Sequence, residues 1–174
     1  MINFYNAILF YSIWWGCVLG ARYSYTFLGP LLLVSLGYIH FKLLSADSGI
    51  NNELKLIFYG GFFGLVVEIF HLYSGLLNYN GYIYENSLLP PAWILCMWIA
   101  FSGTLNYSMS WMKGKWIVMI LSGAIFGPLS YMAGINFNII SFNFNSYVSY
   151  LVLSLVWAIS VPILYKINST VYEN

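Results

Sequence analysis

The residues best suited to chemistry form a stripe in the third apolar segment, at Gly60, Gly64, Glu68, His71 and Gly75. Steps of three and four residues stack side chains on one face of an α-helix, so a carboxyl group and an imidazole share a face with glycines. A carboxylate facing lipid would cost a few kcal/mol or more, so this face should look into the protein or a wet cavity. The stripe therefore predicts a polar site inside a membrane protein.

Three roles are open to Glu68 and His71. Their i, i+3 spacing can place a carboxylate and an imidazole on one metal ion, but the only other histidine, His40, is expected near the opposite end of the bundle. We therefore predict neither a metal nor another cofactor. The pair could instead act as general acid and base, or Glu68 could be a hydrogen-bonded packing residue with His71 at the interface. No catalytic residue is assigned.

Composition places the chain in a lipid environment. Of its 174 residues, 61% are apolar and only 6% are charged, which leaves too little polar surface for a water-soluble domain of this size. The net charge of +1, without a basic cluster, argues against nucleic-acid binding. The first partner to expect is the lipid bilayer.

Six apolar stretches approach the roughly 20 residues that a membrane-spanning helix needs. Helices are predicted because an open strand cannot satisfy its backbone hydrogen bonds in hydrocarbon. We therefore expect one all-α domain over residues 1–174, a polytopic membrane protein built as a compact bundle of six transmembrane helices. The predicted spans are 4–21, 27–44, 54–75, 91–111, 116–135 and 147–165.

Basic residues divide unequally between the two sides of such a bundle. The side with both termini carries five lysines, and the other side carries only Arg22. Because lysine and arginine are enriched in cytoplasmic loops, both termini are predicted to be cytoplasmic. The long outer connections, 76–90 and 136–146, are rich in Asn, Tyr and Phe and are expected to cap the opposite end. The five lysines are Lys42, Lys55, Lys113, Lys115 and Lys166.

Three GxxxG motifs fall on the odd-numbered spans. Glycines allow close helix packing, so the motifs predict a tight central cluster, or a surface that grips another membrane protein. Counted from the cytoplasmic ends of their spans, Tyr131 and Glu68 lie at similar depths. Tyr131 is therefore the expected neighbour of Glu68. The motifs are Gly16 with Gly20, Gly60 with Gly64, and Gly123 with Gly127.

Aromatic and polar side chains converge at this depth and suggest a ligand cavity. Trp98 comes from the fourth span, and Tyr131 follows Pro128, whose ring frees a backbone carbonyl in the fifth. Together with Trp14 and Arg22 from the first span, they would suit a small apolar or amphipathic ligand. Further candidates for the wall are Trp15, Trp93, Cys96 and Ser130.

Polar groups further inward have a simpler interpretation. Asn106 and Thr104 lie within the predicted fourth span and should provide polar contacts between helices. His40 and Lys42 are expected in the cytoplasmic headgroup zone, where basic side chains extend toward water.

Three further segments carry a recognisable pattern. They are Pro90-Pro91-Ala92-Trp93 continued by Leu95, Trp98, Phe101, Thr104-Leu105-Asn106 and Trp111, then 123–134, and the acidic residue and following glycine within 64–75. This pattern resembles a bacterial inner-membrane family classed as a domain of unknown function. The resemblance implies several membrane spans and a bacterial cytoplasmic membrane, and it supplies no activity or site residue.

Three functions compete at this point. The leading hypothesis is a protein that binds or helps to transport a small apolar or amphipathic molecule near Glu68 and His71. The second is an intramembrane enzyme that modifies lipid with the same two residues. The third is an assembly subunit that binds another membrane protein through its GxxxG faces.

Overall fold

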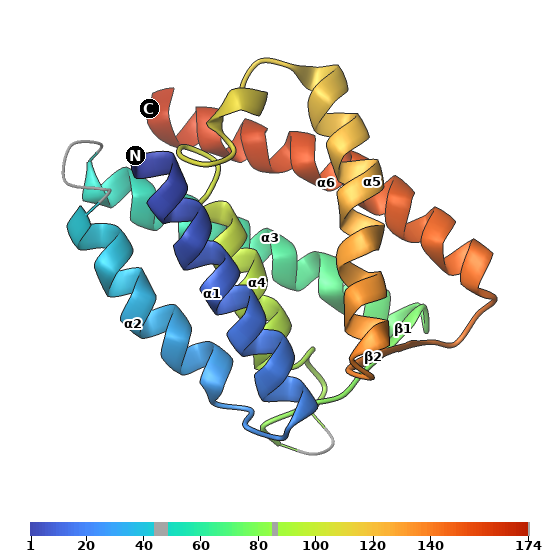
Figure 1. Cartoon of the computed structure of the whole chain (residues 1–174). Coiled ribbons are helices and arrows are strands. Elements are labelled where there is room, and N and C mark those ends of the chain that lie inside the picture. Colours follow the sequence, from blue (N-terminus) through green and yellow to red (C-terminus); the bar gives the residue numbers. More distant parts are fainter. Residues whose placement is uncertain (44–48, 85–86, 174) are drawn as a thin grey trace.

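The computed structural model describes residues 1–43, 49–84 and 87–173. In this part of the chain, six α-helices are joined by turns, one short 3-10 helix and two short strands (Figure 1). The helices are α1 (Ile2–Arg22), α2 (Leu28–Leu43), α3 (Ile50–Tyr73), α4 (Ala92–Ser102), α5 (Trp116–Asn136) and α6 (Ser146–Glu173). The other elements are β1 (Leu77–Tyr79), the 3-10 helix η1 (Ser110–Met112) and β2 (Ile140–Phe142).

Four of the described helices, α1, α3, α5 and α6, are long and apolar enough to cross a membrane. Helix α2 has 16 residues and α4 has 11, which gives lengths of about 24 and 16 Å at 1.5 Å per residue. Large apolar side chains face outward, for example Val34 and Ile117, each 74% exposed. The prediction of an all-helical membrane protein is confirmed at this level, and six full crossings stay a prediction.

The fourth helix is shorter than the predicted span 91–111, whose second half is not α-helical. Helix α4 ends at Ser102, and the chain turns from Gly103 until η1 begins. The Thr104 hydroxyl donates to the Phe101 carbonyl at 2.6 Å, and the Ser108 amide donates to the side chain of Asn6 at 3.2 Å. Short polar side chains in this segment thus provide alternatives to the helical hydrogen bonds.

Other boundaries shift as well. Helix α3 ends at Tyr73, so Gly75, the last residue of the predicted stripe, lies beyond the helix and closes it with φ +70°. The Leu76 amide bonds to the His71 carbonyl at 3.1 Å, as in a glycine-closed helix end. Helix α6 continues past the predicted end at 165 to Glu173. The last residue of predicted span 27–44 lies outside the described residues.

The three GxxxG motifs serve three successive helix pairs rather than one central cluster. A Cβ at Gly16 would lie 2.1 Å from a side-chain atom of Leu32 in α2, and one at Gly64 would lie 2.2 Å from Trp98 in α4. A Cβ at Gly127 would lie 2.2 Å from Trp157 in α6. Each motif therefore lets its helix pack closely against the next helix in the chain. These faces are used within the protein, and a partner bound through them stays a prediction.

Helix α5 accommodates Pro128 with help from α6. Proline has no amide hydrogen, so the carbonyl four residues earlier, on Ala124, loses its helical partner. The Ser154 hydroxyl of α6 donates to that carbonyl at 2.8 Å. The carbonyl freed by the proline therefore links the two helices.

Helices α5 and α6 form a pair that stands beside the other four (Figure 1). Helix α1 packs on α2 and α4, and α4 packs on α3, while α6 joins the two groups through α3. Strands β1 and β2 pair antiparallel, with Leu77 opposite Phe142 and Tyr79 opposite Ile140. The two predicted capping connections thus meet in a small sheet at one end of the bundle.

Candidate functional site

Glu68 is the centre of a buried hydrogen-bond cluster. Its side chain is 1% exposed, and its two carboxyl oxygens face three donors. Oε1 accepts from the Trp98 indole N–H at 2.7 Å and from the Tyr131 hydroxyl at 2.5 Å, while Oε2 accepts from the Tyr79 hydroxyl at 2.5 Å. Hydrogen bonds to a carboxylate are stronger than those between neutral groups. We refer to these four residues and His71 as the Glu68 cluster.

His71 lies on the same face of α3 and is fully buried. Its Nδ1 is 3.4 Å from Glu68 Oε2, a long contact in which the histidine donates if Nδ1 carries the proton. Its Nε2 has no hydrogen-bond partner among the described residues. The Tyr131 ring packs against the imidazole edge to face, with centroids 5.6 Å apart. His71 therefore has one nitrogen available for a further hydrogen bond.

Each donor reaches Glu68 from a different element. Trp98 is on α4 and can approach because Gly64 on α3 has no side chain, as the hypothetical Cβ contact above shows. Tyr131 is on α5 and reaches Glu68, as its predicted depth indicated. Tyr79 is on β1, where the alternation along the strand turns Leu77 and Tyr79 inward and Asn78 outward. The cluster thus connects α3, α4 and α5 to the small sheet formed by β1 and β2.

The Tyr79 phenol is suited to remain a donor. Burial, and then the neighbouring Glu68 carboxyl group, raise the pKa of Tyr79 far above its usual range. The hydroxyl therefore keeps its proton at any physiological pH, and its bond to Glu68 persists.

A cavity of about 490 Å³ lies between α1, α4 and the α5–α6 pair, next to the Glu68 cluster. Trp98 and Tyr131 form part of its wall, so two residues touch both the cavity and the buried carboxyl group. Glu68 and His71 themselves do not line it. The wall also includes Trp14, Trp93, Trp111, Ser122, Ser130 and Trp157.

The structure brings together most of the predicted wall. Trp14, Trp93, Trp98, Ser130 and Tyr131 line the cavity, whereas Trp15, Cys96 and Arg22 do not. Arg22 is exposed at the last turn of α1 and stands outside the Glu68 cluster.

The sequence interpretation missed Tyr79 and Trp157. Trp157 stacks on Trp98 with ring centroids 4.6 Å apart and planes at 16°, and its indole nitrogen has no hydrogen-bond partner among the described residues. The glycines of α5 were the available signal for Trp157, because two small residues one turn apart leave room for a large side chain from the neighbouring helix. Tyr79 gave no such signal, since its place depends on the pairing of β1 with β2.

His40 does not extend toward water, because it is buried and paired with a second buried carboxyl group. Its place in the headgroup zone stays a prediction. His40 Nε2 is 3.0 Å from Glu53 Oε1, and the Glu53 side chain is fully buried. Glu53 also accepts from the Tyr172 hydroxyl at 2.6 Å and from the Asn106 amide at 3.5 Å. Glu53 escaped prediction because it immediately precedes the predicted start of its span at 54.

Asn106 and Thr104 have different roles in the structure. Asn106 bonds across elements as predicted, since it accepts from Asn168 of α6 at 2.8 Å besides contacting Glu53 of α3. Thr104 is buried, but its hydroxyl bonds to the nearby Phe101 carbonyl and so stabilises the end of α4 rather than a helix pair.

The chemistry available to the Glu68 cluster is that of a fixed polar anchor. No group of three or more His, Cys, Asp or Glu side chains that could hold a metal ion occurs within 1–43, 49–84 and 87–173. The carboxyl oxygens are engaged by three donors and are closed off from the cavity. Glu68 can therefore orient Trp98 and Tyr131 toward a ligand without itself touching it.

Long apolar helices, outward-facing apolar side chains and a buried carboxyl cluster beside an aromatic cavity define a helical membrane protein with a candidate ligand site. The chain belongs to the family described as "Protein of unknown function (DUF2878)", whose family model matches residues 3–163. The whole Glu68 cluster lies within the matched residues, whereas Asn168 and Tyr172 lie beyond them. Comparisons with curated proteins and with solved structures gave no match.

Proposed function

We propose that this protein is a bacterial inner-membrane protein that binds, and helps to transport, a small apolar or amphipathic molecule in the cavity beside the Glu68 cluster. The observation that carries the proposal is that Trp98 and Tyr131 both line the cavity and donate to Glu68. A volume of about 490 Å³ falls within the range of roughly 300–1,000 Å³ for small-molecule sites. An aromatic wall with a few fixed polar groups suits a ligand that is mostly apolar.

Binding is favoured over acid–base chemistry by the position of the titratable pair. A general acid or base must reach the reacting atom directly or through one water. Glu68 and His71 are 1% and 0% exposed and do not line the cavity. The lipid-modifying role would require the cluster to open.

The test is native mass spectrometry of the full chain purified in detergent, followed by extraction of bound lipids and metabolites. Ser122 lines the cavity from α5, so Ser122→Phe should fill it, while Ile117→Phe alters the outward face of the same helix. We expect a defined ligand in the parent and in Ile117→Phe, and its loss in Ser122→Phe. Glu68→Leu, which removes the acceptor of Trp98 and Tyr131, should weaken retention by loosening the wall. Equal ligand occupancy in Ser122→Phe and the parent would refute a ligand in this cavity.

We infer that both termini face the cytoplasm and that the Glu68 cluster lies toward the outer face. Asn6 near the start of the chain and Asn168 near its end both bond to the 103–108 segment, which supports a shared end for the termini. Cys17 and Cys96 are buried, so a cysteine introduced at Lys113 or Ser87 can be labelled selectively in intact cells. A membrane-impermeant thiol reagent should label Ser87→Cys from outside and Lys113→Cys only after lysis. The reverse pattern would contradict this orientation.

A further inference from the structure

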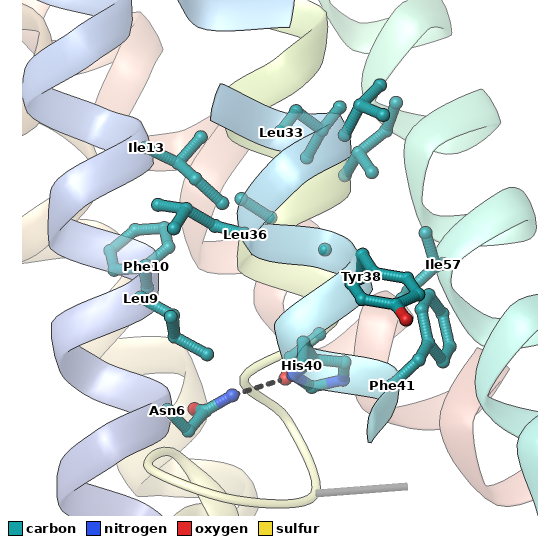
Figure 2. A pocket seen from close by; sticks show the side chains of 15 residues that line it. Asn6, Leu9, Phe10, Ile13, Leu33, Leu36, Tyr38, His40, Phe41 and Ile57 are labelled. Carbon is teal, nitrogen blue, oxygen red and sulfur yellow. Dashed lines mark hydrogen bonds between the residues drawn. The ribbon is translucent and has the colours of Figure 1, made fainter. Parts of the chain in front are cut away.

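A second, smaller cavity of about 290 Å³ lies between α1, α2 and α4, away from the Glu68 cluster. Its walls are mostly aliphatic and aromatic, with Leu9 and Ile13 from α1 and Leu33 and Leu36 from α2 (Figure 2). Gly37 leaves it open, because a Cβ at that position would meet nothing within 4 Å. We call this cavity the α1–α2 groove.

One end of the groove is polar and firmly held. Figure 2 shows Asn6 and His40 together at this end, with Ile13 and Leu33 at the other. Asn6 donates to the Gly103 carbonyl at 2.9 Å, and His40 is fixed by its contact with Glu53. The groove is thus amphipathic along its length, with an apolar run that ends at rigid polar groups.

A lysine ammonium marks the rim of the polar end. The Nζ atom of Lys42 lies 5.1 Å from the centre of the Tyr38 ring, and Tyr38 is itself part of the groove wall. Tyr38 is 60% exposed and Val34, one turn earlier, is 74% exposed. The outer wall therefore faces the surroundings of the protein, and a long side chain with a positive charge folds back over it.

We propose that the α1–α2 groove binds an anionic phospholipid, with one acyl chain along the apolar wall and the phosphate group beside Lys42. Charge complementarity selects this occupant, because basic groups at the ends of membrane helices attract anionic lipid headgroups. The groove lies between helices and has fixed polar groups at one end, which fits a chain with a head better than a flat protein surface. This site is separate from the cavity beside Glu68 and does not depend on its ligand.

The experiment measures lipid binding to the full chain by native mass spectrometry, with phosphatidylglycerol and phosphatidylcholine of identical acyl chains as the two probes. We expect the parent to favour phosphatidylglycerol. Lys42→Gln should lower its apparent affinity about fivefold, the factor expected for one lysine near an anionic headgroup. Gly37→Leu should fill the groove and lower the affinity at least as much. Gly37→Ala, which adds one methyl group, should retain most of the affinity.

The outcomes distinguish a lipid bound in the groove from a headgroup held at the surface by charge alone. Equal binding of the two lipids to the parent would overturn the proposal. Loss in Lys42→Gln together with full retention in Gly37→Leu would also overturn it, because the headgroup would then bind the surface without the groove. Thermal unfolding of each variant in detergent checks that the fold is intact. Leu31→Phe, on an outward-facing position of α2 at 64% exposure, is the control for an added side chain on that helix.

Discussion

Replacing Glu68 by leucine is the most direct test of the buried cluster. Leucine keeps a similar side-chain volume but removes both oxygens, so the Trp98 N–H and the hydroxyls of Tyr79 and Tyr131 lose their acceptor. Side-chain hydrogen bonds between membrane helices average about 0.6 kcal/mol and reach about 1.7 kcal/mol. Three of them set the expected loss at about 2–5 kcal/mol in the free energy of unfolding.

Glu68→Gln is the matched control for this prediction. The amide oxygen can still accept from Trp98 and Tyr131, while the amide NH₂ can donate to the Tyr79 hydroxyl oxygen. We therefore expect a loss of about 1 kcal/mol, smaller than for leucine, since all three neighbours keep a hydrogen-bond partner and only the bond to Tyr79 reverses its direction. Adding Tyr79→Phe and Tyr131→Phe to Glu68→Leu should recover part of the lost stability, because two orphaned donors disappear with the acceptor.

The assay is reversible unfolding in mixed detergent micelles, followed by far-UV circular dichroism and tryptophan fluorescence. The refuting result is a Glu68→Leu protein as stable as Glu68→Gln within about 0.5 kcal/mol, which is below the average for even one membrane hydrogen bond. That result would mean that the three donors find other partners or water once the carboxyl group is gone.

Three further predictions concern the rest of the bundle. Gly127→Leu should destabilise the α5–α6 pair by more than about 1–3 kcal/mol, because even a Cβ there would lie 2.2 Å from an indole carbon; thermal unfolding measures this. Ser154→Ala should cost about 0.6 kcal/mol and speed hydrogen exchange in α5, since the Ala124 carbonyl loses its donor. Tyr172→Phe should cost about 1 kcal/mol in detergent unfolding, because the buried Glu53 loses its shortest hydrogen bond.

The sequence carried enough information for the polar face of α3 and its neighbour. Helical spacing put Gly64, Glu68 and His71 on one face, and depth counting brought Tyr131 to Glu68. Both rest on the regular rise of a helix, which is the most predictable geometry in a membrane protein. The glycine pairs predicted close helix contacts. The helix that packs on each pair could not be predicted, because it depends on the tertiary arrangement and not on the local sequence.

What the sequence could not give were features set by tertiary contacts. The end of α4 at Ser102 depends on bonds such as that between Asn6 and Ser108, which lie 102 residues apart. Tyr79 reaches the site only because β1 pairs with a strand that follows α5. Glu53 was missed since hydropathy alone cannot tell a carboxyl group at a helix start in water from one that is buried there.

The two buried carboxyl groups of α3 also constrain how the chain enters its membrane during synthesis. Glu68 is bonded to Tyr131 of α5 and Glu53 to Tyr172 of α6, so α3 emerges from the ribosome well before these two partners are synthesised. A carboxyl group at the centre of an inserting helix costs up to about 2.5–3.5 kcal/mol. Helix α3 should therefore be poorly held until α6 has been synthesised, and chains truncated before α6 should be cleared by quality-control proteases.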